Sequence, residues 1–164
     1  YLGTSLKALT SDAGIDILSF GGTKNGLMFG EAVVFFNRKL AHNYKYIRKQ
    51  GMQLASKMRY IAVQFDALLE NQLWLENAKR ANAMAALLAS EVGKIPGIRI
   101  THPVEANGVF AEMPKAAAEK LMEKYFFYPW NPEKNEYRWM TSFDMDEEDV
   151  MEFADTVRSV MKLL

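Results

Sequence analysis

The chain has 164 residues, of which 49% are hydrophobic and 24% charged, and its 20 basic and 20 acidic residues give a net charge of zero. This composition is that of an ordinary soluble globular protein with enough apolar material for a core. The balanced charge gives no electrostatic footprint for a nucleic acid or an anionic membrane, so we expect neither as a partner. Without cysteine, and with only two histidines, the chain excludes a disulfide framework, a thiolate metal site and a histidine-rich metal cluster.

Two further features concern where the protein works and how long it is. No apolar run has the length needed to span a bilayer, and the first residues do not read as a signal peptide. Together with the lack of cysteine, this favours a cytoplasmic protein. The chain begins with Tyr1 and not with Met, which predicts a processed or partial product of a longer gene.

The first half of the chain predicts a hairpin followed by helices. Ile15, Ile17 and Phe20 indicate a short buried strand, and residues 31–36 indicate a second one. The glycine-rich stretch between them, which contains Lys24, predicts an antiparallel hairpin that is part of a larger sheet. The pattern is then helical over residues 37–49, and helix-rich with one apolar stripe and almost no breaker from about residue 56 to residue 92.

The second half predicts a small layer of strands and helices. Gly93, Pro96 and Gly97 end the long helical segment. Asp144 and Glu147 predict a capping box at the start of the last helix, which has one apolar face. Between these signals we expect a helix opened by Pro114 and strands at residues 98–101, 108–113, 125–128 and 136–143. This order is typical of an α+β layer with helices on one side of an antiparallel sheet.

Lys24 is the residue whose surroundings most favour a chemical role. It is flanked by glycines, directly follows Thr23 and lies close to Ser19. Glycines let a backbone approach a bulky cofactor, and hydroxyls can reach a phosphate. A lysine that follows a buried strand can act as an amine nucleophile. Short motifs of this kind also occur by chance, and the alternative is a lysine in a solvated turn.

The wider sequence resembles one family in several segments that occur in the family's order. They resemble the threonine aldolase and β-eliminating lyase family, which is pyridoxal-phosphate-dependent and belongs to the aspartate aminotransferase fold group, fold type I. The matching segments are residues 16–26, 31–36, 54–60, 107–110, 136–138 and 141–143. Because these segments cover nearly the whole chain in order, the resemblance is far more specific than the lysine motif alone.

The resemblance implies a fold and a division of the chain. It implies an α/β protein, the carboxy-terminal part of a fold type I pyridoxal-phosphate enzyme: the end of the large-domain sheet, a long linking helix and a small α+β domain with an antiparallel sheet. Residues 1–70 would be the remnant of the cofactor-binding large domain, and residues 71–164 the small domain. In the family, the ring stacked on the cofactor, the carboxylate that pairs with its pyridinium nitrogen and the glycine-rich helix start come from a longer amino-terminal part.

The resemblance also implies roles for individual residues. Lys24 looks like the lysine that holds pyridoxal 5'-phosphate as a Schiff base. Thr23 occupies the place of a hydroxyl residue beside the phosphate, with Ser19 as an assisting residue. Arg59 is similar to a family arginine close to the phosphate, and the resemblance leaves open whether it acts across a subunit boundary. Arg138 resembles the small-domain arginine that binds the substrate α-carboxylate. For each arginine the alternative is a surface ion pair.

The activity implied for the intact protein is retro-aldol cleavage of a β-hydroxy-α-amino acid, threonine or allo-threonine, to glycine and an aldehyde. One alternative is a β-eliminating lyase acting on another amino acid, because the lysine and the carboxylate-binding arginine are shared by such enzymes. Another is that the 164-residue chain is a non-catalytic fragment. The resemblance further implies a homo-oligomer, a dimer or a tetramer, that acts on a small amino-acid substrate.

Overall fold

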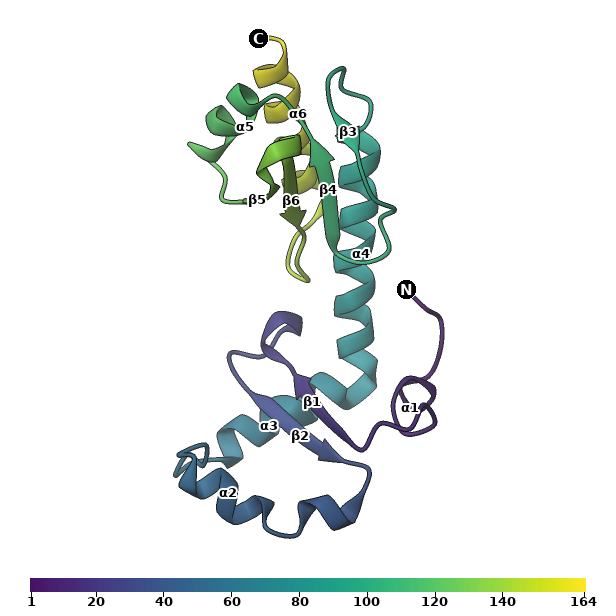
Figure 1. Cartoon of the computed structure of the whole chain (residues 1–164), viewed down its shortest axis with the longest axis vertical. Coiled ribbons are helices and arrows are strands. Elements are labelled where there is room, and N and C mark those ends of the chain that lie inside the picture. The colour runs from purple at the N-terminus through teal and green to yellow at the C-terminus, as the bar shows by residue number, and fades with distance from the viewer. The chain divides into compact units, whose positions relative to one another are not determined.

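The structure is a computed structural model that describes residues 1–164, and it divides into two compact units (Figure 1). The amino-terminal unit is residues 2–74, and the carboxy-terminal unit is residues 75–164 together with Tyr1, whose hydroxyl donates to Glu105 at 3.3 Å. The predicted assignment of residues 1–70 and 71–164 to a large and a small domain stays a prediction. No helix in the chain combines the length and the apolar character needed to cross a membrane.

The amino-terminal unit is built around one hairpin. Strands β1 (Ile17–Gly21) and β2 (Glu31–Phe35) pair antiparallel in a register that runs from Ile17 opposite Phe35 to Gly21 opposite Glu31. The predicted hairpin is therefore present. The remaining elements of the unit are α1 (Leu6–Leu9), the short 3-10 helices η1 (Thr23–Asn25), η2 (Arg38–Ala41) and η3 (Glu70–Gln72), and the helices α2 (Tyr44–Gln50) and α3 (Arg59–Leu69).

The helical segments are shorter than the sequence pattern predicts. Residues 37–49 divide into η2 and α2, and the segment from residue 56 to residue 92 divides into α3 and α4 (Leu73–Val92). The break between α3 and α4 lies at Asn71 and Gln72, whose φ angles of 51° and 61° are left-handed. A left-handed residue cannot continue an α-helix, and asparagine tolerates this conformation better than most residues. Without glycine or proline at this point, the break escaped the sequence pattern.

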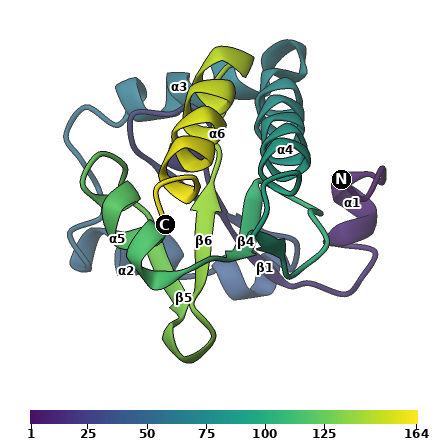
Figure 2. The same ribbon diagram turned by 90° about the horizontal axis from the view of Figure 1, so that it is seen from above.

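The carboxy-terminal unit is a four-stranded antiparallel sheet covered by helices on one face. Its strands are β3 (Arg99–Ile100), β4 (Gly108–Glu112), β5 (Tyr128–Asn131) and β6 (Glu136–Met140), in the spatial order β3-β4-β6-β5. Helices α4 and α6 (Glu147–Met161) lie side by side over the sheet (Figure 2), and α5 (Lys115–Met122) packs beside α6. The core lies between these layers, and the sheet contributes Val109, Ala111, Tyr137 and Trp139 to it. The predicted α+β layer is therefore present.

The predicted boundaries of three elements in this unit were wrong. Strand β5 begins at Tyr128, where the prediction ended, and β6 ends at Met140, not at residue 143. The capping box of α6 is formed by Asp146 and Asp149, not by Asp144 and Glu147. Asp144 lies before the cap and accepts a hydrogen bond from the Ser142 hydroxyl, which lowers the pKa of Asp144. Because each of these aspartates is a good N-cap residue, spacing alone did not decide between them.

Candidate active site

Lys24 lies in a tight loop of residues 22–30, which we call the lysine loop. The Gly22 carbonyl accepts hydrogen bonds from the backbone N–H groups of Asn25 at 2.9 Å and Leu27 at 3.1 Å. The Gly22 N–H donates to the Gly30 carbonyl at 3.3 Å and so closes the loop. Gly26 ends η1 with a φ of 117°, a conformation that favours glycine. The loop is therefore a closed turn with Lys24 at the middle of its 3-10 helix.

Side chains from within the amino-terminal unit fix this loop. Leu27 is buried against Gly22, where an added Cβ would lie 2.1 Å from the Leu27 Cδ1 atom. The Asn25 side-chain amide donates to the Trp74 carbonyl at 3.0 Å, and the Met28 N–H donates to the Gln64 side chain at 3.0 Å. The motif glycines were expected to make room for a cofactor, but Gly22 makes room for a side chain of the protein itself. At Gly22, the neighbour that excludes a side chain is Leu27.

The side chains of Thr23 and Lys24 are exposed, and neither makes a hydrogen bond or an ion pair within the chain. Lys24 is therefore not buried within this unit. The strand that leads into the loop is only half-buried, because the hairpin has helical cover on one side and no further strands beside it. What the unit does provide is an unpaired primary amine beside an unpaired hydroxyl, both held on a fixed turn. That pair can react with a carbonyl carbon and donate to an anion.

Ser19 lies on β1 and its hydroxyl already has a partner. It donates to the Glu31 carboxylate on β2 at 3.1 Å. Gly21, directly opposite Glu31, makes room for this carboxylate, because an added Cβ would lie 2.8 Å from its Oε1 atom. The predicted assistance of Ser19 to a phosphate therefore requires this hydrogen bond to break and an anion to approach a carboxylate.

Arg59 is the first residue of α3 and is exposed. Its guanidinium carbon lies 4.8 Å from the centre of the Tyr60 ring, and it makes no ion pair. The alternative of a surface ion pair is thus not realised within the chain. Its predicted place beside a phosphate stays a prediction.

Arg138 lies on β6, which is flanked on both sides by other strands. Its cross-strand neighbours are Phe110 on β4 and Tyr128 on β5. Since Tyr137 and Trp139 face the core, Arg138 projects from the open face of the sheet, away from the helices. Its guanidinium carbon lies 5.0 Å from the centre of the Trp130 ring and 5.7 Å from that of Tyr128. The side chain is half-buried between these rings.

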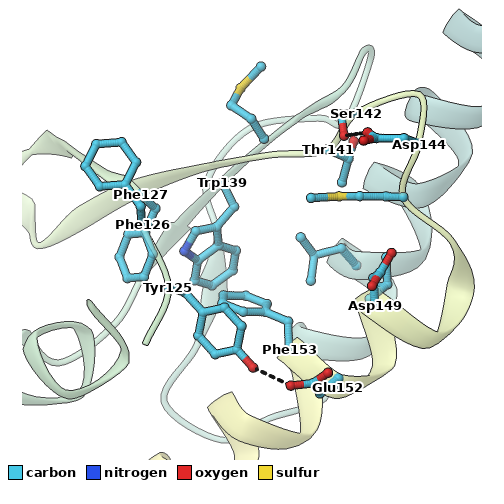
Figure 3. A pocket seen from close by; sticks show the side chains of 14 residues that line it. Tyr125, Phe126, Phe127, Trp139, Thr141, Ser142, Asp144, Asp149, Glu152 and Phe153 are labelled. Carbon is cyan, nitrogen blue, oxygen red and sulfur yellow. Dashed lines mark hydrogen bonds between the residues drawn. The ribbon is translucent and has the colours of Figure 1, made fainter. Parts of the chain in front are cut away.

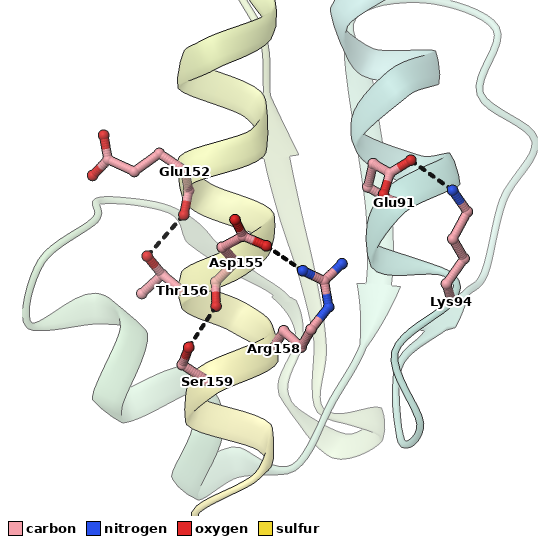
Figure 4. A network of polar contacts seen from close by, with 7 residues as sticks. All are labelled: Glu91, Lys94, Glu152, Asp155, Thr156, Arg158 and Ser159. Atoms are coloured by element: carbon pink, nitrogen blue, oxygen red, sulfur yellow. Dashed lines mark hydrogen bonds and ion pairs between the residues drawn. The ribbon is translucent and has the colours of Figure 1, made fainter.

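The guanidinium of Arg138 has no acceptor within the chain, and its Nε atom is buried without a hydrogen bond. The three other arginines of the carboxy-terminal unit are all paired. Arg80 donates to the Met145 carbonyl at 2.8 Å, Arg99 donates to Glu112 at 3.1 Å, and Arg158 pairs with Asp155 (Figure 4). The surface ion pair considered for Arg138 is therefore absent. A desolvated cation without a partner is suited to binding an anion from outside the chain.

The aromatic side chains beside Arg138 were not predicted as part of the site. As a sequence alone, the run of aromatic residues from Tyr125 to Trp130 favours core or subunit packing. In the structure Phe127 is buried in the core, whereas Tyr128 and Trp130 are exposed beside Arg138. The alternation of a strand could have separated these two faces, had β5 been placed at its true residues. His102 lies on a loop, with its Nε2 atom 3.3 Å from the buried Glu136 carboxylate.

A cavity of about 380 Å³ lies elsewhere in the carboxy-terminal unit (Figure 3). Trp139 and Phe153 form part of its wall, and the hydrogen-bonded pairs Tyr125–Glu152 and Ser142–Asp144 lie at its edges. Neither Lys24 nor Arg138 lines it. The cavity is therefore separate from the residues that the sequence singles out.

Comparison with known proteins shows which enzymes this chain is similar to, although no family model matches the chain. The low specificity L-threonine aldolase of Pseudomonas sp. strain NCIMB 10558 is 47% identical over 161 residues, 98% of this chain and 46% of that protein. The enzyme of the same name from Pseudomonas aeruginosa is 46% identical over 162 residues, again 98% of this chain and 46% of that protein. Over 98% of its length the chain is therefore similar to threonine aldolases. It spans about half the length of these relatives.

Solved structures show a similar likeness. The Leishmania major threonine aldolase matches 90% of this chain and 44% of its own, with a TM-score of 0.82 and 28% sequence identity. A glycine decarboxylase (P-protein) of the glycine cleavage system, solved in inhibitor-bound form, matches 88% of this chain and 35% of its own, with a TM-score of 0.53 and 18% identity. The second match concerns the fold alone. Together they confirm the predicted mixed α/β, fold type I class.

Proposed function

We propose that the full-length protein is a pyridoxal-phosphate-dependent lyase that cleaves a β-hydroxy-α-amino acid to glycine and an aldehyde. Threonine and allo-threonine are the proposed substrates. The names of the Pseudomonas and Leishmania relatives support this reaction. The observation in the structure that carries the substrate assignment is Arg138, a half-buried guanidinium with no acceptor of its own on the open face of a sheet.

The lysine loop suits the proposed cofactor. Lys24 offers an unpaired amine and Thr23 an unpaired hydroxyl, on a turn that Leu27 and Asn25 fix from inside. We assign to Lys24 the covalent attachment of the cofactor aldehyde, and to Thr23 a hydrogen bond donated to its phosphate. Arg59, which has no ion pair in the chain, is assigned the counter-charge to that phosphate. Ser19 is a weaker candidate, since its hydroxyl donates to Glu31.

The chemistry divides between the cofactor and the residues of this chain. Pyridoxal phosphate, when bound, acts as the electron sink for the bond that breaks at the substrate α-carbon. Arg138 binds the α-carboxylate through its planar fork of N–H donors and so sets which α-carbon bond is oriented for cleavage. We further propose that the protein acts in the cytoplasm as a homodimer or homotetramer.

Replacement of Lys24 tests the proposal. In the full-length protein, Lys24→Ala should lower threonine cleavage by about 10³-fold or more, because the amine that attaches the cofactor is gone. Borohydride reduction followed by peptide mass analysis should find the cofactor on Lys24 in the parent protein and nowhere in the variant. Lys39→Ala, at another exposed lysine of the same unit, is the control and should keep both properties. Undiminished threonine cleavage by Lys24→Ala would exclude the assignment.

The products distinguish the alternative reaction within the family. Glycine and an aldehyde indicate the retro-aldol reaction, whereas pyruvate and ammonia indicate β-elimination. The possibility that the 164-residue chain is inactive by itself has its own support, because the chain spans 46% of its relatives and Lys24 is exposed in it. Titration of this polypeptide with pyridoxal phosphate addresses that point. A saturable imine absorbance would show that the 164-residue chain binds the cofactor. Its absence would favour a non-catalytic fragment and would leave the function proposed for the full-length protein unchanged.

A further inference from the structure

The aromatic rings around Arg138 form a bridge over its side chain. Trp130 on β5 and Phe110 on β4 contact each other with ring centres 5.2 Å apart and planes inclined at 67°. Strand β6 lies between β4 and β5. The contact between the two rings therefore has to cross β6, on the face from which Arg138 projects. We call Trp130 and Phe110 the aromatic bridge.

The aromatic bridge explains the unusual state of the guanidinium. The Nε atom of Arg138 is buried although no acceptor faces it, and the guanidinium carbon lies 5.0 Å from the Trp130 ring centre. A cation this close to an aromatic ring is attracted by the ring's electron-rich face, which offsets part of the cost of burial. With Nε covered, the terminal nitrogens are the donors left for a ligand. The bridge also limits the rotamers of a long, flexible side chain before any ligand binds.

The exposure of the rings argues against a purely structural role. Trp130 is 51% exposed and Tyr128 is 53% exposed, so neither is a core residue. Phe110, which is only partly buried, meets His102 on its other side at 5.0 Å between ring centres. Large aromatic side chains left half-exposed beside an unpaired arginine are typical of a binding surface.

We propose that Trp130 is a positioning residue for Arg138 and that, through it, the aromatic bridge selects a free α-carboxylate over an uncharged amide. This inference rests on the proposed function, because it assumes that Arg138 binds the substrate carboxylate. Trp130 itself does not contact the reacting atoms. It holds the guanidinium so that its terminal N–H groups face the carboxylate, and Tyr128, 5.7 Å from the same carbon, lies against the cation as a second ring.

The test compares glycine with glycinamide as ligands of the full-length, cofactor-loaded protein by calorimetry. Both carry the amine, and only glycine carries the carboxylate. In Trp130→Leu we expect glycine to bind about tenfold more weakly and glycinamide to change by less than about twofold. Trp130→Phe should restore most of the affinity for glycine, because it restores an aromatic face. In turnover of threonine by Trp130→Leu, KM should rise by a larger factor than kcat falls.

One further variant is a control, and a second disrupts the aromatic bridge independently of Trp130. Phe126→Leu is the matched control, since Phe126 is 84% exposed and contacts Tyr128 and not Arg138. It should leave both affinities unchanged. Phe110→Leu opens the aromatic bridge from the other strand and should reproduce the selective loss for glycine, which keeps the test decisive if Trp130→Leu folds poorly.

The outcomes separate this inference from the proposed function. If Arg138→Leu removes the preference for glycine over glycinamide while both bridge variants keep it, Arg138 binds the carboxylate and the positioning role of Trp130 is wrong. Equal weakening of both ligands in the bridge variants would also overturn that role. If Arg138→Leu itself leaves the preference for glycine unchanged, Arg138 does not bind the carboxylate. The role given to Arg138 in the proposed function is then wrong, and the inference about Trp130 falls with it.

Discussion

At the scale of single residues, Lys24 and Arg138 share the absence of a partner. Many basic side chains of the chain lie in ion pairs, such as Lys94 with Glu91 and Lys120 with Glu123. Lys24 and Arg138 have neither an ion pair nor a hydrogen bond. Exposed ion pairs are worth little, so the exposed Lys24 loses no stability by lacking one. The half-buried Arg138 does carry a cost of burial, which the nearby rings offset in part. The lack of a partner leaves both side chains available to a ligand.

The ion pair of Lys124 and Glu152 gives a pH prediction. The Lys124 amine lies 2.7 Å from the Glu152 carboxylate, which also accepts from the Tyr125 hydroxyl at 3.2 Å. The hydrogen bond from Lys124 lowers the pKa of Glu152 below its ordinary 4.5, and the same bond raises the pKa of Lys124. A carboxyl whose folded-state pKa is lowered stabilises the fold above its unfolded pKa. That contribution is lost as the pH falls through the folded value.

Glu152→Gln should therefore melt slightly below the parent protein at pH 7, and the difference should vanish as the pH falls well below 4.5. The shift should be small, because both side chains are largely exposed. Thermal unfolding over a series of pH values measures it. A difference in melting temperature that is the same at every pH would show that the substitution acts through packing and not through charge.

At the scale of elements, the lysine loop shows how a glycine motif can serve the fold and the site together. Gly22 accepts two backbone hydrogen bonds and lies against Leu27, which is one of the few buried side chains of its unit. The loop thereby holds Lys24 on a fixed turn although the side chain itself is exposed. We infer that the loop conformation is formed before any cofactor binds.

Gly22→Ala tests the packing of the lysine loop. The added Cβ would lie 2.1 Å from the Leu27 side chain, so one of them must move, and we expect a loss of about 1–3 kcal/mol in the free energy of unfolding. Urea unfolding of the full-length protein provides the measurement. Gly108→Ala is a suitable control, because its Cβ would meet the Met140 sulfur at 3.4 Å and a Phe110 ring carbon at 3.7 Å, which are both ordinary contact distances. An unchanged stability in Gly22→Ala would mean that Leu27 is not held against the loop in solution.

At the scale of the whole molecule, the buried apolar side chains are distributed unevenly. In the amino-terminal unit only Leu27 and Leu68 are buried, whereas the carboxy-terminal unit has a continuous core between its sheet and three helices. Local stability follows buried apolar area. The carboxy-terminal unit therefore has a core of its own. The hairpin of the amino-terminal unit is covered by other elements on only part of its surface.

Hydrogen exchange should reveal this difference. In the 164-residue chain, amides of β4 and β6 should exchange much more slowly than those of β1 and β2. In the full-length protein, β1 and β2 should become protected, as expected for a hairpin within a larger sheet, while β4 and β6 should change little. Mass spectrometry of peptides from both proteins provides the comparison. Equal protection of the two pairs of strands in the short chain would contradict the prediction.

Much of the fold could be predicted from local patterns. The hairpin of β1 and β2, strand β4, and helices α5 and α6 lie close to where alternation and helical periodicity place them. The break at Asn71 could not be predicted, because no glycine or proline marks it. The choice of Asp146 as N-cap could not be predicted, because two aspartates offered similar local signals. The ring contacts between β4 and β5 also escaped prediction, since they depend on which strands flank β6.

By itself, the sequence determined an α/β pattern and a resemblance to threonine aldolases, with Lys24 and Arg138 as its chemical candidates. Residue types, spacing and ordered motifs carry that information along the chain. Only the tertiary structure decided that Leu27 occupies the space beside Gly22, that Ser19 donates to Glu31, and that Trp130 reaches across β6 above Arg138. The physical reason is that strand register and side-chain packing join residues far apart in sequence, which no local pattern specifies.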